Sequence, residues 1–170
     1  MKIEILAPLE QPTTQPITSS MSETEGRVEY VFRMRGATFR LSIETGYLFD
    51  GASIPRLCWT LLGLTPHGAM DGPAIPHDKG YQDQGKFEQG MFQVLVGDSW
   101  ADTDRGMTRN ELDNLLQALC LHFKVCGRFK ASLVYSAVRC CGWRAWKRND
   151  KQRKAMQVLS DAVEAMEVDE

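Results

Sequence analysis

The residue types best suited to chemistry stand close together near the middle of the chain, at His77, Asp78 and Tyr81. In a helix, His77 and Tyr81 lie one turn apart on the same face, and Asp78 points about 100° round the helix axis from the histidine. A histidine can act as a general base, and a neighbouring carboxylate can hold a cation. The spacing therefore predicts a base and a cation ligand that face different directions.

A general base needs an acceptor on its second ring nitrogen, and Asp113 is the best candidate for that role. The capping-box sequence from Thr108 to Glu111 begins a predicted helix in which Asp113 lies at the edge of the apolar stripe. A carboxylate partly removed from water needs a partner. We therefore expect a His77–Asp113 dyad supported by Tyr81; in the alternative, Asp113 turns outward near the start of the helix and Tyr81 only packs.

Asp78 is predicted to hold calcium, together with backbone carbonyls of the glycine-rich segment 66–72. A cation beside His77 would polarise a carbonyl and stabilise an oxyanion. In the competing interpretation, Asp78 is an acidic residue near a helix N-terminus that needs no metal.

A second unusual segment, from Asp50 to Arg56, is a compact loop that a hydrophobic core does not require. Asp50 and Ser53 are predicted to support the site or to lock the turns of this loop, because Asp and Ser side chains cap turns. Gly51 permits unusual φ values and Pro55 fixes the exit from the loop.

The same residue types allow two other combinations. A metal site of the HD phosphohydrolase kind would use His67, His77, Asp78 and Asp113, but that architecture is all-helical and His67 lies in a Gly/Pro-rich segment. A Ser53–His77–Asp113 triad lacks the strand–G-x-S-x-G–helix context of a nucleophilic serine.

Composition limits the class of protein. A chain of 170 residues with 43% hydrophobic content suits one domain over residues 1–170. The net charge of −2 and the pI of about 5.9 give no reason to expect nucleic acid as a partner. No apolar run approaches the roughly 20 residues that span a bilayer, so the protein is not expected to be transmembrane. Five cysteines without zinc-site spacing or a signal peptide predict reduced thiols.

The N-terminal part is predicted to be β-structure. Residues 1–26 are predicted to be an extended arm or loop that includes a short strand at 2–6. After that strand, Pro8, Pro12 and Pro16 interrupt regular structure. Residues 28–34 and 38–43 alternate polar and apolar side chains around a tight connection, which predicts a β-hairpin. Residues 87–96 predict a further strand or small hairpin.

The remainder is predicted to be helical. Pro76 suits the first position of a short helix, Thr108 caps the clearest helix, residues 129–146 form another, and residues 150–170 end the chain in a helix with an acidic tail. The fold class is therefore α+β, with a small N-terminal antiparallel β part followed by about three or four helices. Basic residues around Trp143 and Trp146 form either a solvated face or a contact for anionic lipid or nucleic acid.

The order of these motifs resembles a family of small phage and prophage proteins, catalogued as domain of unknown function 1353. The matching segments are Asp50-Gly51-Ala52-Ser53-Ile54-Pro55, His77-Asp78 with Tyr81, Thr108-Arg109 ahead of Asp113, Ala137-Val138-Arg139, and Gly142-Trp143. The resemblance covers about residues 28–147. It implies a phage or prophage setting, in the cytoplasm of the infected host or in the virion.

The histidine–aspartate pattern is also similar to the core of secreted and viral phospholipase A(2) enzymes. That similarity implies that His77 activates water, Asp78 binds calcium, Asp113 orients His77 and Tyr81 supports Asp113. The chain lacks the disulfide framework of the secreted enzymes, and Gly72-Pro73 is all that matches their calcium loop. The expected function is a phospholipase-like ester hydrolase; the alternative is a non-catalytic virion or accessory module whose partners are other viral structural proteins.

Overall fold

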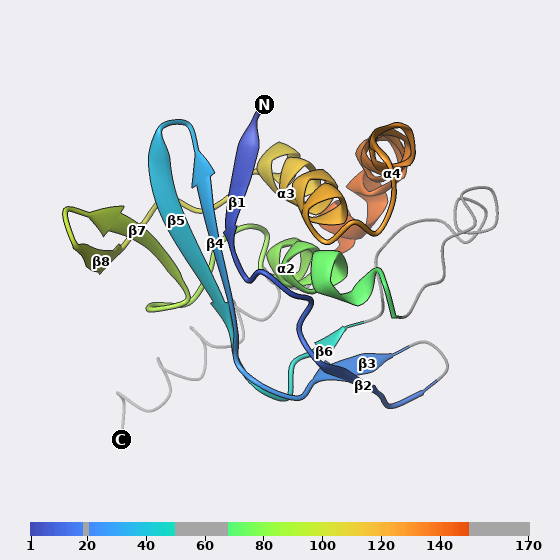
Figure 1. The fold of residues 1–170 in the computed structure, drawn as a ribbon, viewed down its shortest axis with the longest axis horizontal. Helices are drawn as coiled ribbons and strands as arrows, with labels where there is room; N and C mark the ends of the chain where they lie inside the picture. Colours follow the sequence, from blue (N-terminus) through green and yellow to red (C-terminus); the bar gives the residue numbers. More distant parts are fainter. Residues whose placement is uncertain (19–20, 50–67, 150–170) are drawn as a thin grey trace, which may run out of the picture.

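The computed structural model describes residues 1–18, 21–49 and 68–149. A five-stranded antiparallel sheet, ordered β1-β4-β5-β7-β8, forms one layer, and helices α2, α3 and α4 lie on one side of it (Figure 1). A small sheet ordered β2-β3-β6 lies below the helices in that view. The α+β fold predicted from the sequence is confirmed.

The centre of the large sheet is the predicted hairpin. β4 (Val28–Met34) pairs with β5 (Ala37–Ile43) through an unbroken register, and the two-residue turn between them has positive φ at Arg35 and Gly36. Two positive φ values give the turn the twist that matches the strands. Alternate side chains of β4 are buried in the core: Val28, Tyr30, Phe32 and Met34.

Within the first 26 residues, the strand predicted at 2–6 is present as β1 (Ile3–Ala7), an edge strand of the large sheet paired with β4. The residues after it differ from the predicted arm. β2 (Thr14–Pro16) pairs with β3 (Ser22–Thr24), which pairs with β6 (Leu48–Phe49). The prolines shorten these strands without preventing them, since a sheet edge tolerates a missing N–H.

The predicted strand or hairpin at 87–96 lies partly further along the chain. β7 (Phe92–Val96) and β8 (Ser99–Asp102) form a hairpin across Gly97 and Asp98, and β7 pairs with β5. The large sheet is therefore completed by strands that follow the first described helix.

α2 (Asp71–Gln82) begins five residues before Pro76, so the prediction that Pro76 opens this helix is wrong. A proline inside a helix leaves the carbonyl four residues earlier without its usual donor. Here that carbonyl belongs to Gly72, and it accepts a 2.8 Å hydrogen bond from the buried hydroxyl of Tyr30. The sheet thus supplies the donor that the proline lacks.

α3 (Arg109–His122) begins with the predicted capping box, in which Thr108 and Glu111 each bond the other's backbone N–H. α4 (Arg128–Cys141) is followed by a turn at Gly142 and helical residues 143–149, where the sequence predicts one helix over 129–146. An added Cβ at Gly142 would lie 2.7 Å from the Tyr81 hydroxyl, so a glycine is needed there.

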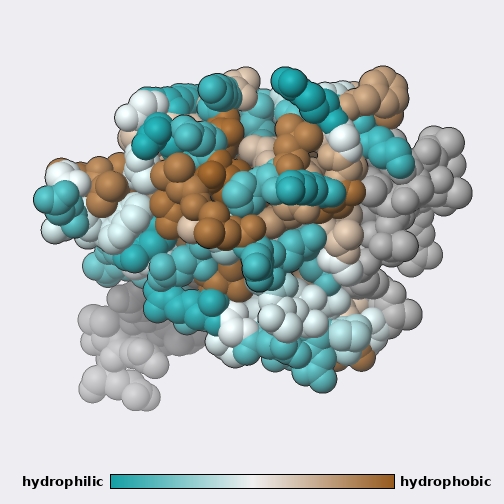
Figure 2. Space-filling model, viewed as in Figure 1, coloured by the Kyte–Doolittle hydropathy of each residue, from teal (hydrophilic) through white to brown (hydrophobic). Residues whose placement is uncertain are grey.

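Hydrophilic residues cover much of the face shown in Figure 2, with an apolar area over the strands of the large sheet. Within the described residues, no helix combines the length and the apolar character needed to cross a membrane. The predicted C-terminal helix at 150–170 and the loop from Asp50 to Arg56 lie outside the described residues.

Candidate functional site

The site is built where α2 crosses α3. Gly80 permits this close approach, because an added Cβ would lie 2.3 Å from Cδ2 of the buried Leu112. With the two helices this close, His77 and Tyr81 on α2 face Asp113 on α3.

His77, Tyr81 and Asp113 meet in one hydrogen-bonded cluster. Nε2 of His77 lies 3.1 Å from Oδ1 of Asp113, and the Tyr81 hydroxyl donates to the same oxygen at 2.7 Å. The imidazole and phenol rings lie against each other, with centroids 4.2 Å apart. The structure thus brings together the three residues that the sequence places in a dyad and its support; their chemical roles stay predictions.

A fourth member of the cluster was missed by the sequence analysis. Arg139 on α4 donates from Nη1 to Oδ2 of Asp113 at 2.8 Å, and its own backbone carbonyl accepts from Arg109 at 2.9 Å. Both oxygens of the Asp113 carboxylate are therefore occupied. The sequence signals for Arg139 were its place in the Ala137-Val138-Arg139 segment of the family resemblance and its position in a basic helix with an apolar stripe, which is also typical of a solvated face.

The hydrogen bonds and charges in the cluster shift the pKa values of its members. Burial alone would raise the pKa of Asp113, but the hydrogen bonds from His77, Arg139 and Tyr81 hold it below its usual value. Burial would likewise lower the pKa of His77, yet its contacts with Asp113 and Asp78 raise it. The pKa of Tyr81 is raised by burial and by the nearby Asp113 charge, so its hydroxyl stays a donor.

The second ring nitrogen of His77 faces Asp78. Nδ1 lies 3.5 Å from Oδ1 of Asp78, and the exposed fractions of His77, Asp78 and Asp113 are 1%, 3% and 0%. The histidine is therefore held between two carboxylates, one on each side of the ring. Because Asp113 contacts Nε2, Nδ1 is the ring nitrogen that can accept a proton from another group.

Two carbonyls of the segment predicted to bind calcium are already hydrogen-bonded. In the segment 66–72, the carbonyl of Gly68 accepts from the Asp71 N–H, and that of Gly72 accepts from Tyr30. These hydrogen bonds stabilise the start of α2. Across the described ranges, no group of three or more His, Cys, Asp or Glu side chains is arranged to hold a metal ion. The cation role of Asp78 stays a prediction, and no chemical step below is derived through calcium.

Other residues singled out in the sequence cannot be placed. Asp50, Ser53 and His67 lie outside the described residues. Two surface hollows formed by described residues, one beside β4 and one between the end of α2 and the start of α3, are lined by neither His77 nor Asp113.

The fold and the site together define an α+β domain in which two packed helices hold a buried histidine–aspartate pair. Residues 27–138 match the family described as "Protein of unknown function (DUF1353)", and the chain belongs to that family. The matched range contains His77, Asp78, Tyr81 and Asp113, and ends one residue before Arg139. Neither a curated protein nor a solved structure matches the chain.

Proposed function

We propose that the protein hydrolyses a carboxylic ester, with His77 as the general base. The observation that carries this proposal is the pair of contacts on the imidazole ring. Asp113 holds Nε2 at 3.1 Å, which leaves Nδ1 as the nitrogen that can take a proton from water beside Asp78. A base oriented by a buried carboxylate on its other nitrogen is the usual arrangement for this chemistry.

The proposed reaction needs water, the ester and His77 alone as reacting groups. Nδ1 of neutral His77 accepts a proton from water, and the hydroxide attacks the ester carbonyl. The carbon–oxygen bond to the leaving alcohol then breaks, and the alcohol takes the proton from His77. Asp113 stabilises the imidazolium between these steps, while Tyr81 and Arg139 hold Asp113 in place.

The substrate class we propose is the acyl ester of a phospholipid, in a phage or prophage setting. This part of the proposal rests on the likeness of the His77, Asp78, Tyr81 and Asp113 pattern to phospholipase A(2). The orientation of the four side chains is consistent with that likeness, because Tyr81 donates to the same carboxylate that holds the histidine.

The test is release of fatty acid from phospholipid vesicles by the wild type and by His77→Gln. Loss of the base should lower the rate by about 10²–10⁴-fold. The matched control is His122→Gln, which removes a histidine that contacts the Pro8 carbonyl and the Phe123 ring, outside the cluster, and should leave the rate unchanged. A wild-type protein that releases no fatty acid, while unfolding cooperatively, would overturn the proposal.

Calcium is tested separately with Asp78→Asn. If Asp78 holds the cation, the wild type loses activity in a chelator and Asp78→Asn is inactive with or without calcium. Activity of the wild type that persists in the chelator would leave His77 and Asp113 as the base and its support, and would remove the metal from the mechanism.

A second candidate is a non-catalytic phage virion or accessory module. The burial of His77, Asp78 and Asp113 favours it, because a water molecule and an ester must reach Nδ1 for hydrolysis. In that case the cluster only fastens α2, α3 and α4 together. His77→Gln would then lower the free energy of unfolding without any activity to lose.

A further inference from the structure

The outer side of α4 carries a line of exposed side chains that the core does not use. The buried residues of this helix, Ala131, Val134 and Val138, lie on the opposite side. At 100° per residue, six exposed residues fall within about 40° of one line along α4 and its continuation. They are Phe129, Leu133, Ser136, Cys140, Trp143 and Lys147.

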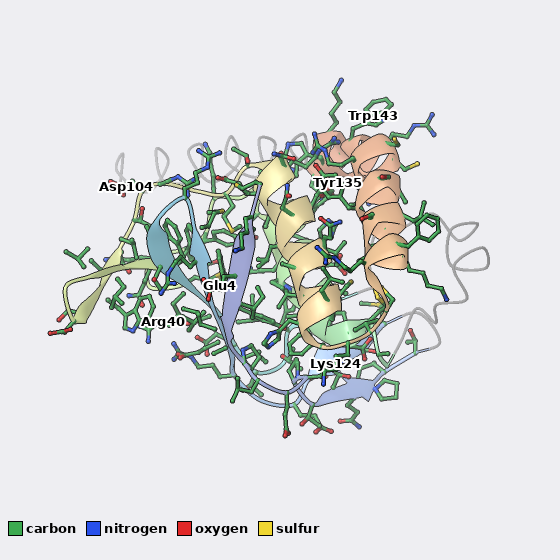
Figure 3. All side chains as sticks on the ribbon, turned by 45° about the horizontal axis from the view of Figure 1, so that its top comes forward. Glu4, Arg40, Asp104, Lys124, Tyr135 and Trp143 are labelled. Carbon is green, nitrogen blue, oxygen red and sulfur yellow. The ribbon has the colours of Figure 1, made fainter. Side chains whose placement is uncertain are left out.

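This line, called here the outer stripe, is apolar over most of its length. The exposed fractions of Phe129, Leu133 and Trp143 are 77%, 39% and 44%. Figure 3 shows Trp143 at the end of α4, projecting away from the body of the protein. From Phe129 to Lys147 the outer stripe spans roughly 27 Å at 1.5 Å per residue. Exposed aromatic residues in such a line mark an interaction surface more often than scattered apolar residues do.

The charge beside the outer stripe has one sign. Residues 114–149 contain no Asp or Glu, and they contain seven cations in a protein whose net charge is −2: Lys124, Arg128, Lys130, Arg139, Arg144, Lys147 and Arg148. Of these, Arg139 is committed to Asp113. The guanidinium of Arg144 and the ammonium of Lys147 lie 5.5 Å and 5.2 Å from the centre of the Trp143 ring.

We propose that the outer stripe docks on an anionic lipid surface. Aromatic and aliphatic side chains enter the boundary between headgroups and acyl chains, while Arg and Lys beside them reach the phosphates. Trp143 between two cations supplies both parts of this contact at one place. An anionic membrane fits this surface by charge, since residues 114–149 include no acidic side chain that would repel it.

The shape of the surface separates lipid from single-stranded nucleic acid. Single strands are bound in grooves that follow the backbone, whereas the outer stripe runs along the convex side of a helix. Neither of the two hollows described above includes a residue of the outer stripe. The inference goes beyond the proposed hydrolase and holds whether or not His77 is catalytic, because its test measures binding alone.

The experiment measures co-sedimentation of the full chain with vesicles made of equal parts phosphatidylglycerol and phosphatidylcholine. The wild type should bind these vesicles, bind pure phosphatidylcholine weakly, and lose affinity as salt rises. Arg144→Gln/Lys147→Gln should weaken binding about 25-fold, since each cation near an anionic surface contributes about fivefold. Trp143→Ala should weaken binding about tenfold, because the ring no longer enters the interface.

The controls change the same residue types elsewhere. Arg27→Gln/Arg33→Gln removes two exposed cations from the β4 side of the protein, and Trp100→Ala removes a tryptophan from β8; both should bind as the wild type does. Three results would overturn the inference: no binding of the wild type to the anionic vesicles, equal weakening by the control pair, or tighter binding to a single-stranded oligonucleotide than to the vesicles.

Discussion

Asp113 is the residue on which the geometry of the site depends. Its carboxylate is fully buried, yet its pKa is lowered, because His77, Tyr81 and Arg139 all contact it. A buried charge persists only when hydrogen bonds and opposite charge compensate its loss of hydration. The same three contacts fix the position of the imidazole, so stability and proposed function share one carboxylate.

Asp113→Ala should lower the free energy of unfolding by about 3–5 kcal/mol, because it removes the buried carboxylate that His77, Tyr81 and Arg139 share. Asp113→Asn keeps the shape and should cost less. Denaturant unfolding measures both variants. Glu88→Ala, at an exposed position, serves as the control and should stay within about 0.5 kcal/mol of the wild type. A cost for Asp113→Ala below about 1 kcal/mol would contradict this account of the cluster.

The sequence predicted the pairing of His77 with Asp113 but left open that Asp113 turns outward. A helical turn puts His77 and Tyr81 on one face, and a carboxylate at the edge of an apolar stripe needs a partner. Arg139 could not be predicted in the same way. It reaches the carboxylate only because α4 packs beside α3, and a basic residue on a helix is ordinarily solvated. Tertiary packing decided that role.

The N-terminus of α3 is stabilised by Glu111. Its carboxylate accepts from the Thr108 N–H at 2.9 Å, pairs with Arg35 at 3.1 Å and contacts Arg105 closely. Burial would raise the pKa of Glu111, but the bonds from Thr108 and Arg105 hold it below the usual 4.5. One side chain therefore joins the helix cap, the β4–β5 turn and the segment before α3.

This cap predicts a pH dependence of stability. Because the folded pKa of Glu111 is lowered, its contribution is present above the unfolded value of about 4.5 and is lost as pH falls through the folded pKa. Glu111→Gln should cost about 1.5–3 kcal/mol at neutral pH, and its difference from the wild type should shrink at about pH 3. Urea unfolding at both pH values checks this, with Glu88→Gln as control. An unchanged difference in acid would show that ionisation of Glu111 does not matter.

Local signals predicted the elements whose ends are set locally. Two to four neighbouring residues determine the turn at Arg35 and Gly36, and the same holds for the capping box at Thr108. The start of α2 was predicted too far along the chain. Pro76 is accommodated inside the helix because the hydroxyl of the distant Tyr30 bonds the carbonyl that the proline leaves without a donor. The strand predicted at 2–6 is β1, whereas β2 and β3 were not separated from an arm, because each is only three residues long and β3 has its second partner in the distant β6.

The layer of helices is joined to the sheet where Pro76 removes one backbone hydrogen bond from α2. Tyr30 lies in the centre of β4, and its hydroxyl fills the place of the N–H that Pro76 lacks. Gly72 is also held from the N-terminal connection, since its N–H donates to Gln11 at 3.3 Å. Sheet, helix and N-terminal segment thus meet at Gly72, five residues before His77.

Tyr30→Phe should therefore cost about 1–3 kcal/mol, because it leaves the buried carbonyl of Gly72 without a donor. Pro76→Ala restores a backbone N–H four residues after Gly72, so the same Tyr30→Phe change should cost less in that background. Denaturant unfolding of the wild type, both single variants and the double variant gives the coupling energy directly. Additive costs would mean that the Tyr30 hydroxyl and the proline act independently. A positive coupling would establish that the sheet permits the proline in α2, and with it the helix that carries His77.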